Sequence, residues 1–309
     1  MRIPSLSALP GCSTGCRVAV IVAVSALAAL GFPRGPIAAG GASSASADPF
    51  QADFSHARRI PEGRYLYRFA WNGIPSAKSE VVVRVEKDGE RPYYCFKGTA
   101  RTSKFADIFW KFRAYAVAVV DVLSGRAIRI HIAEQQNTKF KETETVFNYE
   151  SSEAYYTRWK KGKVKRERIR LEGNTIDPAS LGLMLCQKPL VVGDSAAFVV
   201  LVGDDPYALT YTVTARERIS AANGEFDALR VEPRFHKIED ENKRRPPKVR
   251  RMTLWLTASE PRIPLKMKSR TFVGHVTGEL VQVLPSAAEA REESASAPRR
   301  KHQTDSIRS

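Results

Sequence analysis

Residues 63–86 read GRYLYRFAWNGIPSAKSEVVVRVE, and their side chains alternate in character on both sides of a turn. The aromatic residues of the first half all share one parity: Tyr65, Tyr67, Phe69 and Trp71. In the second half, valines recur at every other position from Val81 to Val85. A period of two is typical of strands, and Asn72-Gly73 supplies the turn chemistry of a hairpin. The stretch therefore predicts two antiparallel strands with one aromatic face.

The same rhythm continues along most of the chain. Short runs of alternating apolar and polar residues follow one another up to residue 283, with turn signals such as Asp88-Gly89, Ser124-Gly125 and Asn223-Gly224 between them. We count about a dozen strands and find no strand-helix-strand repeat. This pattern predicts a mainly β protein, with a single antiparallel curled sheet that forms a barrel or half-barrel.

Two segments have helical rather than strand-like spacing. Residues 103–111 place Phe105, Ile108 and Phe109 on one side after Ser103, which is a suitable N-cap. We expect a short helix whose apolar side covers an end of the sheet. Residues 177–186 begin with Asp177-Pro178, a cap followed by a first-turn proline, and predict a second short helix that packs on the sheet.

The two ends of the chain differ from its middle. Residues 1–47 hold arginines, an apolar run from 18 to 32, and small residues that end at Ala47, but no acid. This layout predicts a cleavable signal peptide, so we expect a secreted protein in the periplasm; an uncleaved inner-membrane anchor is the alternative. We divide the remainder into a polar lead-in (48–60), an antiparallel β domain (61–285) and a disordered tail (286–309).

Removal of the leader would leave the cysteines Cys95 and Cys186. A pair of cysteines in an oxidising compartment predicts a possible disulfide. The alternative is two buried free thiols that behave as small apolar side chains. The sequence leaves both alternatives open, because it does not give the distance between the two residues.

The chain is a basic protein with a formal charge of +16. A basic patch is concentrated around Trp159, and it consists of Arg158, Lys160, Lys161, Lys163, Lys165, Arg166 and Arg168. Such a hairpin could bind an anionic membrane surface or an acidic polymer, and we do not expect nucleic acid as the partner. The alternative is a solvated edge, since lysines on an edge strand also prevent unwanted strand pairing.

The usual catalytic motifs are absent from the sequence. There is no GxSxG, HExxH, P-loop or GxGxxG pattern, and the five histidines lack metal-ligand spacing. We therefore expect no enzyme activity, no catalytic residue, no metal and no cofactor. The sequence instead offers an aromatic lining for a concave apolar surface: Tyr65, Tyr67, Phe69, Trp71, Tyr211 and Trp255. The alternative for each of these residues is a filled core.

Three blocks of the sequence together suggest a family. They are residues 63–77, the middle segment Asp177-Pro178-Ala179-Ser180-Leu181, and residues 254–265 (LWLTASEPRIPL) followed by 274–280. These blocks resemble those of a bacterial cell-envelope family, domain of unknown function 3108. The resemblance spans residues 61–283 and implies one exported, strand-rich domain without an established activity or catalytic set. The basic hairpin and the charged residues 243–248 depart from the family pattern.

These observations leave three functional interpretations. The leading one is an uncharacterised exported envelope protein, not an enzyme, that binds an apolar or lipid-like ligand in its concave β surface; it predicts a continuous apolar cavity. The alternative is a structural or scaffolding interaction module whose basic hairpin binds an acidic partner; it predicts a packed core. The third, an unrecognised hydrolase, predicts a polar cleft with converging acids or with cysteine and histidine.

Overall fold

The computed structural model describes residues 58–173, 175–238, 250–271 and 274–286. The expected signal peptide, most of the lead-in, the charged residues 243–248 and nearly all of the expected tail lie outside these ranges. The strands are β1 (Gly63–Trp71), β2 (Ile74–Asp88), β3 (Arg91–Thr102), β4 (Phe112–Asp121), β5 (Ala127–Gln136), β6 (Lys139–Asn148), β7 (Glu153–Lys160), β8 (Lys163–Arg170), β9 (Thr175–Ile176), β10 (Ser195–Val202), β11 (Asp205–Ala221), β12 (Gly224–Val231), β13 (Arg234–Lys237), β14 (Arg250–Thr257), β15 (Pro264–Arg270) and β16 (His275–Pro285). The helices are α1 (Lys104–Phe109) and α2 (Pro178–Gln187).

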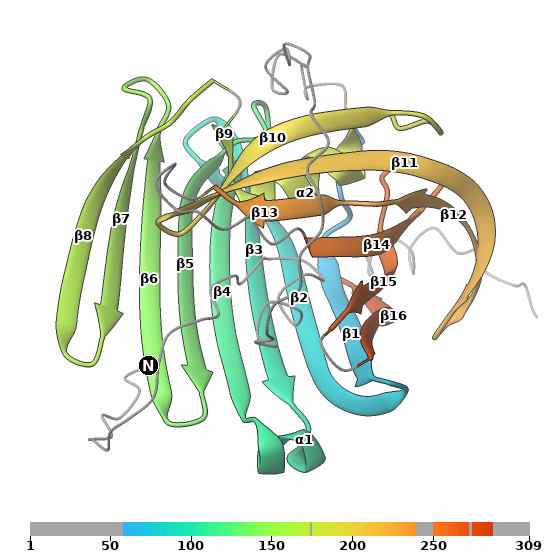
Figure 1. Cartoon of the computed structure of the whole chain (residues 1–309). Helices are drawn as coiled ribbons and strands as arrows, with labels where there is room; N and C mark the ends of the chain where they lie inside the picture. The colour runs from blue at the N-terminus through green and yellow to red at the C-terminus, as the bar shows by residue number, and fades with distance from the viewer. Residues whose placement is uncertain (1–57, 174, 239–249, 272–273, 287–309) are drawn as a thin grey trace, which may run out of the picture.

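All 16 strands belong to one sheet, in the order β8-β7-β6-β5-β4-β3-β2-β1-β16-β15-β14-β12-β11-β10-β9. β13 lies off this path and pairs with β11 and β14. The pairs are antiparallel apart from the short parallel pair of β9 with β10. The end strands β8 and β9 do not pair with each other in the described part of the chain, so the sheet curls without closing into a barrel (Figure 1).

The predicted fold class is confirmed in its main terms: a mainly β protein with a large curled antiparallel sheet and two short helices. The opening hairpin is also as predicted, since β1 and β2 pair around Asn72-Gly73, and both of these residues have a positive φ. The expected count of about a dozen strands was too low. The strands that the sequence does not predict include the short β9 and β13, which have two and four residues.

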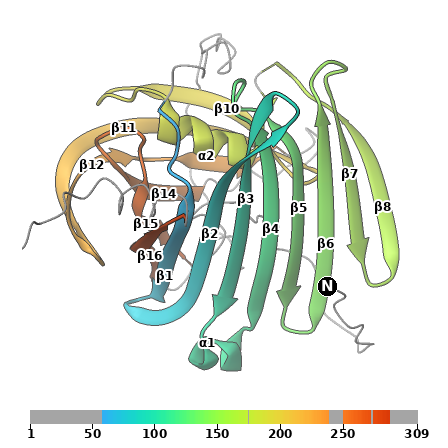
Figure 2. The ribbon, with the colours of Figure 1, turned by 180° about the vertical axis from the view of Figure 1, so that it is seen from behind.

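Helix α2 lies on the concave side of the sheet, between β2 and β3 on one side and β10 and β11 on the other (Figures 1 and 2). Leu183 and Met184 of this helix belong to the same core cluster as Tyr65, Tyr67 and Phe69 of β1. The core is therefore built between the inner face of the curled sheet and one helix. Burial of apolar area contributes roughly 25 cal/mol per Å², so this packing is a principal source of stability.

The start of α2 is anchored by a buried cap. Asp177 accepts hydrogen bonds from the amides of Ala179 (2.8 Å) and Ser180 (3.0 Å), and from the Ser180 hydroxyl. The Ser180 Oγ in turn accepts a hydrogen bond from the Ala127 amide at the start of β5 (2.8 Å). Asp177 and Ser180 are fully buried, so the cap both begins the helix and joins it to the sheet.

Helix α1 forms where the sequence predicts it, but it does not cover the sheet. Ser103 is its N-cap and accepts a hydrogen bond from the Ala106 amide, as expected. The helix has no buried residue, and Phe105, Ile108 and Phe109 are 53%, 75% and 76% exposed. Apolar spacing identifies a helical face correctly, but it is the same whether that face meets a core or solvent.

The possible disulfide between Cys95 and Cys186 is not formed, and both are buried free cysteines. Cys186 belongs to α2, on the concave side of the sheet. Cys95 has the opposite parity to its inward neighbours Tyr94 and Phe96, so it belongs to the other face of β3. The sheet separates the two thiols, and burial raises the pKa of Cys186 to about 12.

We expect Asp177→Ala to lower the free energy of unfolding by about 2 kcal/mol, because it leaves buried amides and a hydroxyl without their acceptor. Urea denaturation followed by circular dichroism measures this change. Asp227→Ala is the control, since Asp227 pairs with Arg216 on the exposed surface and should contribute less than about 1 kcal/mol. Equal effects of the two substitutions would contradict the structural role of the cap.

We also expect the mature protein, purified without reductant, to carry Cys95 and Cys186 as thiols that react with iodoacetamide only after unfolding. The thiolate is the reactive form, and burial disfavours it for both residues. Peptide mapping by mass spectrometry, before and after denaturation at pH 8, tests this expectation. A peptide that links the two cysteines would show that the disulfide forms after all.

Candidate functional site

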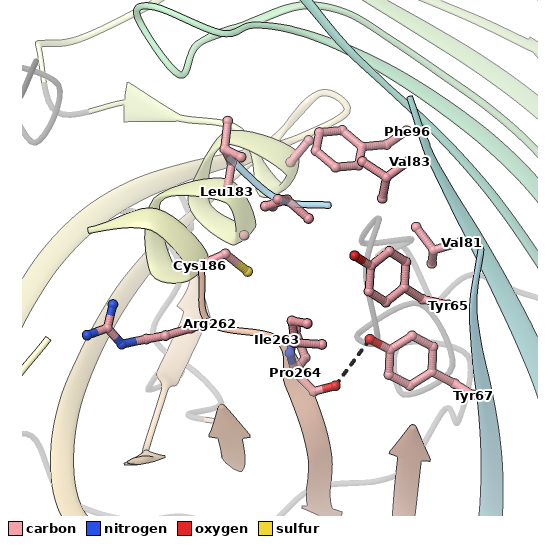
Figure 3. A pocket seen from close by; sticks show the side chains of 13 residues that line it. Tyr65, Tyr67, Val81, Val83, Phe96, Leu183, Cys186, Arg262, Ile263 and Pro264 are labelled. Carbon is pink, nitrogen blue, oxygen red and sulfur yellow. Dashed lines mark hydrogen bonds between the residues drawn. The ribbon is translucent and has the colours of Figure 1, made fainter. Parts of the chain in front are cut away.

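A small void lies between β1, β2 and α2. Tyr65 and Tyr67 face Leu183 and Cys186 across it, and Pro264 lies near its lower end (Figure 3). The Tyr67 hydroxyl donates to the Pro264 carbonyl (3.2 Å), and the Tyr65 hydroxyl donates to the Pro61 carbonyl (2.8 Å). Burial raises the pKa of Tyr67, so this phenol stays neutral at physiological pH. The void is thus lined mostly by apolar groups, but Arg262 adds a buried guanidinium, whose Nη1 donates to the Lys188 carbonyl (2.8 Å).

The volume of this void is about 30 Å³. That is room for about two water molecules, whereas binding sites for small organic ligands enclose ~300–1,000 Å³. A second void of about 20 Å³ lies between β5, β6 and the start of α2. In the described residues the concave side of the sheet near α2 is therefore a packed core rather than a continuous cavity.

Four of the six aromatic residues proposed as a lining belong to one buried core cluster. Tyr65 and Tyr67 border the first void, and Phe69 is buried in the same core. Tyr211 is also buried, and its ring stacks on Phe198 with 6.1 Å between ring centroids. These four residues are therefore buried in the core that the sheet forms with α2.

The two tryptophans of the proposed lining are less deeply buried, and Trp255 packs against the same core cluster. Trp71 is at the end of β1, beside the β1–β2 turn, and is 38% exposed. Trp255 has the opposite parity to the buried Leu254 and Leu256, and its indole Nε1 donates to Glu217 (2.8 Å). Trp71 shares the parity of the buried Tyr65, Tyr67 and Phe69, so its exposure reflects its position at the strand end. Parity does explain the placement of Trp255, but the sequence does not show which parity of β14 faces the core.

The proposed basic patch occupies the β7–β8 hairpin, and β8 is the end strand of the sheet. Lys161 and Gly162 form its two-residue turn with positive φ angles of 52° and 71°, as in type I′ hairpins. Register places Arg158 opposite Lys165 on one face and Thr157 opposite Arg166 on the other. The cations are therefore distributed over both faces of the hairpin and its turn.

Some of these cations are neutralised within the fold. Lys165 pairs with Asp204 (2.9 Å) and with Glu167. Arg168 pairs with Glu153, and this contact lowers the pKa of the Glu153 carboxyl. Within the described residues, we find no acidic partner for another group of hairpin cations: Arg158, Lys161, Lys163, Arg166 and Arg170. All of these except Arg158 are exposed.

The ion pair of Lys165 with Asp204 also connects β8 to the turn between β10 and β11 across the curled sheet. Asp204 lies in the turn between β10 and β11, and its side chain is only 4% exposed. In the same turn, Gly203 lies so close to Tyr156 of β7 that an added Cβ would be 3.2 Å from the ring. The turn therefore bridges to the β7–β8 edge by side-chain contacts where the backbone ladder does not close.

Groups of histidine, cysteine, aspartate and glutamate that could hold a metal ion are not found in the described residue ranges. Nor does any helix in these ranges have the length and hydropathy to cross a membrane. What remains as a candidate functional site is the basic hairpin at the sheet edge.

Fold and site together define a mainly β, half-barrel protein with a packed core and a basic edge. The chain belongs to the family described as "Protein of unknown function (DUF3108)", which matches residues 66–281. This confirms the family resemblance that the opening, middle and closing blocks suggest. A search of curated proteins found no match.

Several solved structures are similar to this chain. A β-barrel-like protein of the domain of unknown function DUF1849 from Brucella abortus is 13% identical with a TM-score of 0.48, over 74% of this chain and 98% of that one. A candidate lipoprotein from Parabacteroides distasonis is 10% identical with a TM-score of 0.31, over 72% and 95%. The hypothetical lipoprotein YmcC from Escherichia coli is 10% identical with a TM-score of 0.28, over 73% and 86%.

We expect Lys165→Met to lower the free energy of unfolding by about 1 kcal/mol, because it removes a cation from the largely buried Asp204. It should also speed amide hydrogen exchange in residues 201–205, which the pair connects to β8. Mass spectrometry of deuterium uptake measures the local effect. Lys163→Met, in the same hairpin, is the control, and equal exchange in both variants would contradict the bridging role.

Proposed function

We propose that this protein is an exported, non-enzymatic interaction module of the cell envelope, which uses the β7–β8 hairpin to bind an acidic partner. The signal-like residues 1–47 support export to the periplasm. The packed inner face of the sheet supports a function at the surface rather than in an enclosed pocket. The family is one of unknown function, so the proposal rests on the geometry of this chain.

The observation that carries the proposal is the set of cations without an acidic partner in the described structure. Lys161, Lys163 and Arg166 are exposed on the turn and outer strand of the sheet edge. A cluster of like charges raises the electrostatic energy of the folded state, and an anionic surface lowers it. Edge lysines also prevent strand pairing, but that role requires no acidic partner and predicts no specific binding.

The apolar-ligand interpretation is less well supported. The void beside Tyr65 and Tyr67 is about 30 Å³, so a lipid-like ligand could enter only if α2 moved away from the sheet. Such a movement would separate the buried Asp177 and Ser180 from Ala127. Native mass spectrometry of the mature protein tests this alternative directly, and a defined lipid adduct would favour it.

We expect the mature protein to bind soluble poly-L-glutamate, and the triple variant Lys161→Glu, Lys163→Glu and Arg166→Glu to bind it at least about tenfold more weakly. The attraction is electrostatic, so affinity should also fall when salt is raised from about 50 to about 200 mM. Isothermal titration calorimetry measures both effects.

The matched control reverses the same number of exposed cations at the opposite end of the sheet: Arg84→Glu, Lys87→Glu and Arg91→Glu. This control has the same net charge as the hairpin variant. If both triple variants lose affinity equally, the effect is one of net charge and the hairpin is not the binding site.

A further inference from the structure

One end of the half-barrel is a continuous rim of turns. The Ser103 amide, just before α1, donates to the Ser76 carbonyl near the β1–β2 turn (2.8 Å). After α1, the Lys111 amide donates to the Asn137 side chain of the β5–β6 turn (2.9 Å), and the Asn137 amide donates to the Lys111 carbonyl (2.7 Å). The β7–β8 turn lies at the same end (Figure 1). We call this end, residues 101–111, 136–140 and 158–165, the basic rim.

Large apolar side chains project from the basic rim into solvent. Helix α1 presents Phe105, Ile108 and Phe109, and the Phe105 and Phe109 rings contact each other edge to face at 5.7 Å. Phe140 and Val164, the second residues of β6 and β8, are each 48% exposed. None of these side chains contributes to the described core, so the fold alone does not account for their apolar character.

The same rim is strongly cationic. Its three segments contain nine lysines and arginines and a single acid, Asp107. Asp107 is held by Arg113 (2.5 Å), and this contact lowers the pKa of its carboxyl to about 2. The exposed cations come from all three segments: Arg101, Lys104, Lys111, Lys139, Lys160, Lys161 and Lys163. Exposed apolar and basic side chains therefore share one end of the molecule.

We propose that the basic rim docks on the surface of an anionic phospholipid bilayer, with α1 inserted among the headgroups. The inference rests on the proposed function, because the hairpin supplies part of the charge, and it names the partner. Each lysine or arginine near such a surface contributes about 1 kcal/mol, and apolar side chains gain further by leaving water at the acyl boundary. A soluble acidic polymer would use the lysines but would leave Phe105, Ile108 and Phe109 in water.

The apolar and the basic side chains of the basic rim can be substituted independently, so their contributions to binding can be measured separately. The variant Phe105→Ser, Ile108→Ser and Phe109→Ser removes the apolar group from a helix without buried residues, so the fold should remain intact. Its control, Leu123→Ser, Val191→Ser and Val192→Ser, removes the same number of apolar side chains that are also more than half exposed but lie away from the rim. Circular dichroism and the thermal midpoint verify that both variants fold.

The measurement is co-sedimentation of the mature protein with vesicles of phosphatidylcholine alone or with about one third phosphatidylglycerol. We expect binding only to the anionic vesicles, weakened at least about tenfold by the α1 variant and by the hairpin triple variant, and unchanged in the apolar control. The α1 variant should still bind poly-L-glutamate normally. When a polarity-sensitive dye is attached to a Phe109→Cys protein, its fluorescence emission should move to shorter wavelength on anionic vesicles. The emission of the same dye on a Leu123→Cys protein should not change.

The outcomes separate the two proposals. The membrane inference would be overturned if the protein bound poly-L-glutamate through the hairpin but did not bind vesicles. It would also be overturned if the α1 substitutions left vesicle binding unchanged. Either result would leave the acidic-partner proposal standing. Failure to bind either probe would overturn both. Equal loss in the α1 variant and in the apolar control would show that general surface hydrophobicity, and not the basic rim, is responsible.

Discussion

The packing of α2 against the inner face of the curled sheet is the interaction on which the rest of the structure depends. An open sheet of this length exposes a concave apolar face, and that face must be covered. Leu183 and Met184 meet the aromatic row of β1, and the buried cap of Asp177 and Ser180 joins the helix to β5. Because the helix fills the curl, the space that a barrel often reserves for a ligand is reduced to voids too small for a lipid.

Because the interior is filled, we expect the function to lie at the surface. The charge on that surface is distributed unevenly. Lys165 and Arg168 are used within the fold, where they pair with Asp204 and Glu153. Lys161, Lys163 and Arg166 of the same hairpin have no acidic partner in the described structure, and the hairpin turn lies at the same end of the sheet as the apolar residues of α1. One hairpin thus contributes both to the curl of the sheet and to the proposed docking surface.

The sequence predicts local structure well, because local structure follows from neighbouring residues. Strand parity identifies the aromatic face of β1, and Ser103 and Asp177 mark both helix starts. Contacts between distant residues have no such signal. The bridge from Lys165 to Asp204 spans 39 positions, and nothing in either segment shows that the turn after β10 reaches β8. Nor could spacing show that α1 faces solvent, or that Cys95 and Cys186 lie on opposite sides of the sheet.

The central claim is that this protein acts through its basic rim and not through its interior. The most direct test is amide hydrogen exchange of the mature protein with and without anionic phospholipid vesicles, read by mass spectrometry. The account predicts protection confined to residues 101–111, 136–140 and 158–165, with no change in α2 or β1. Altered exchange centred on α2 and the β1 aromatic residues, with an unchanged rim, would contradict it and would point to a ligand that enters the core.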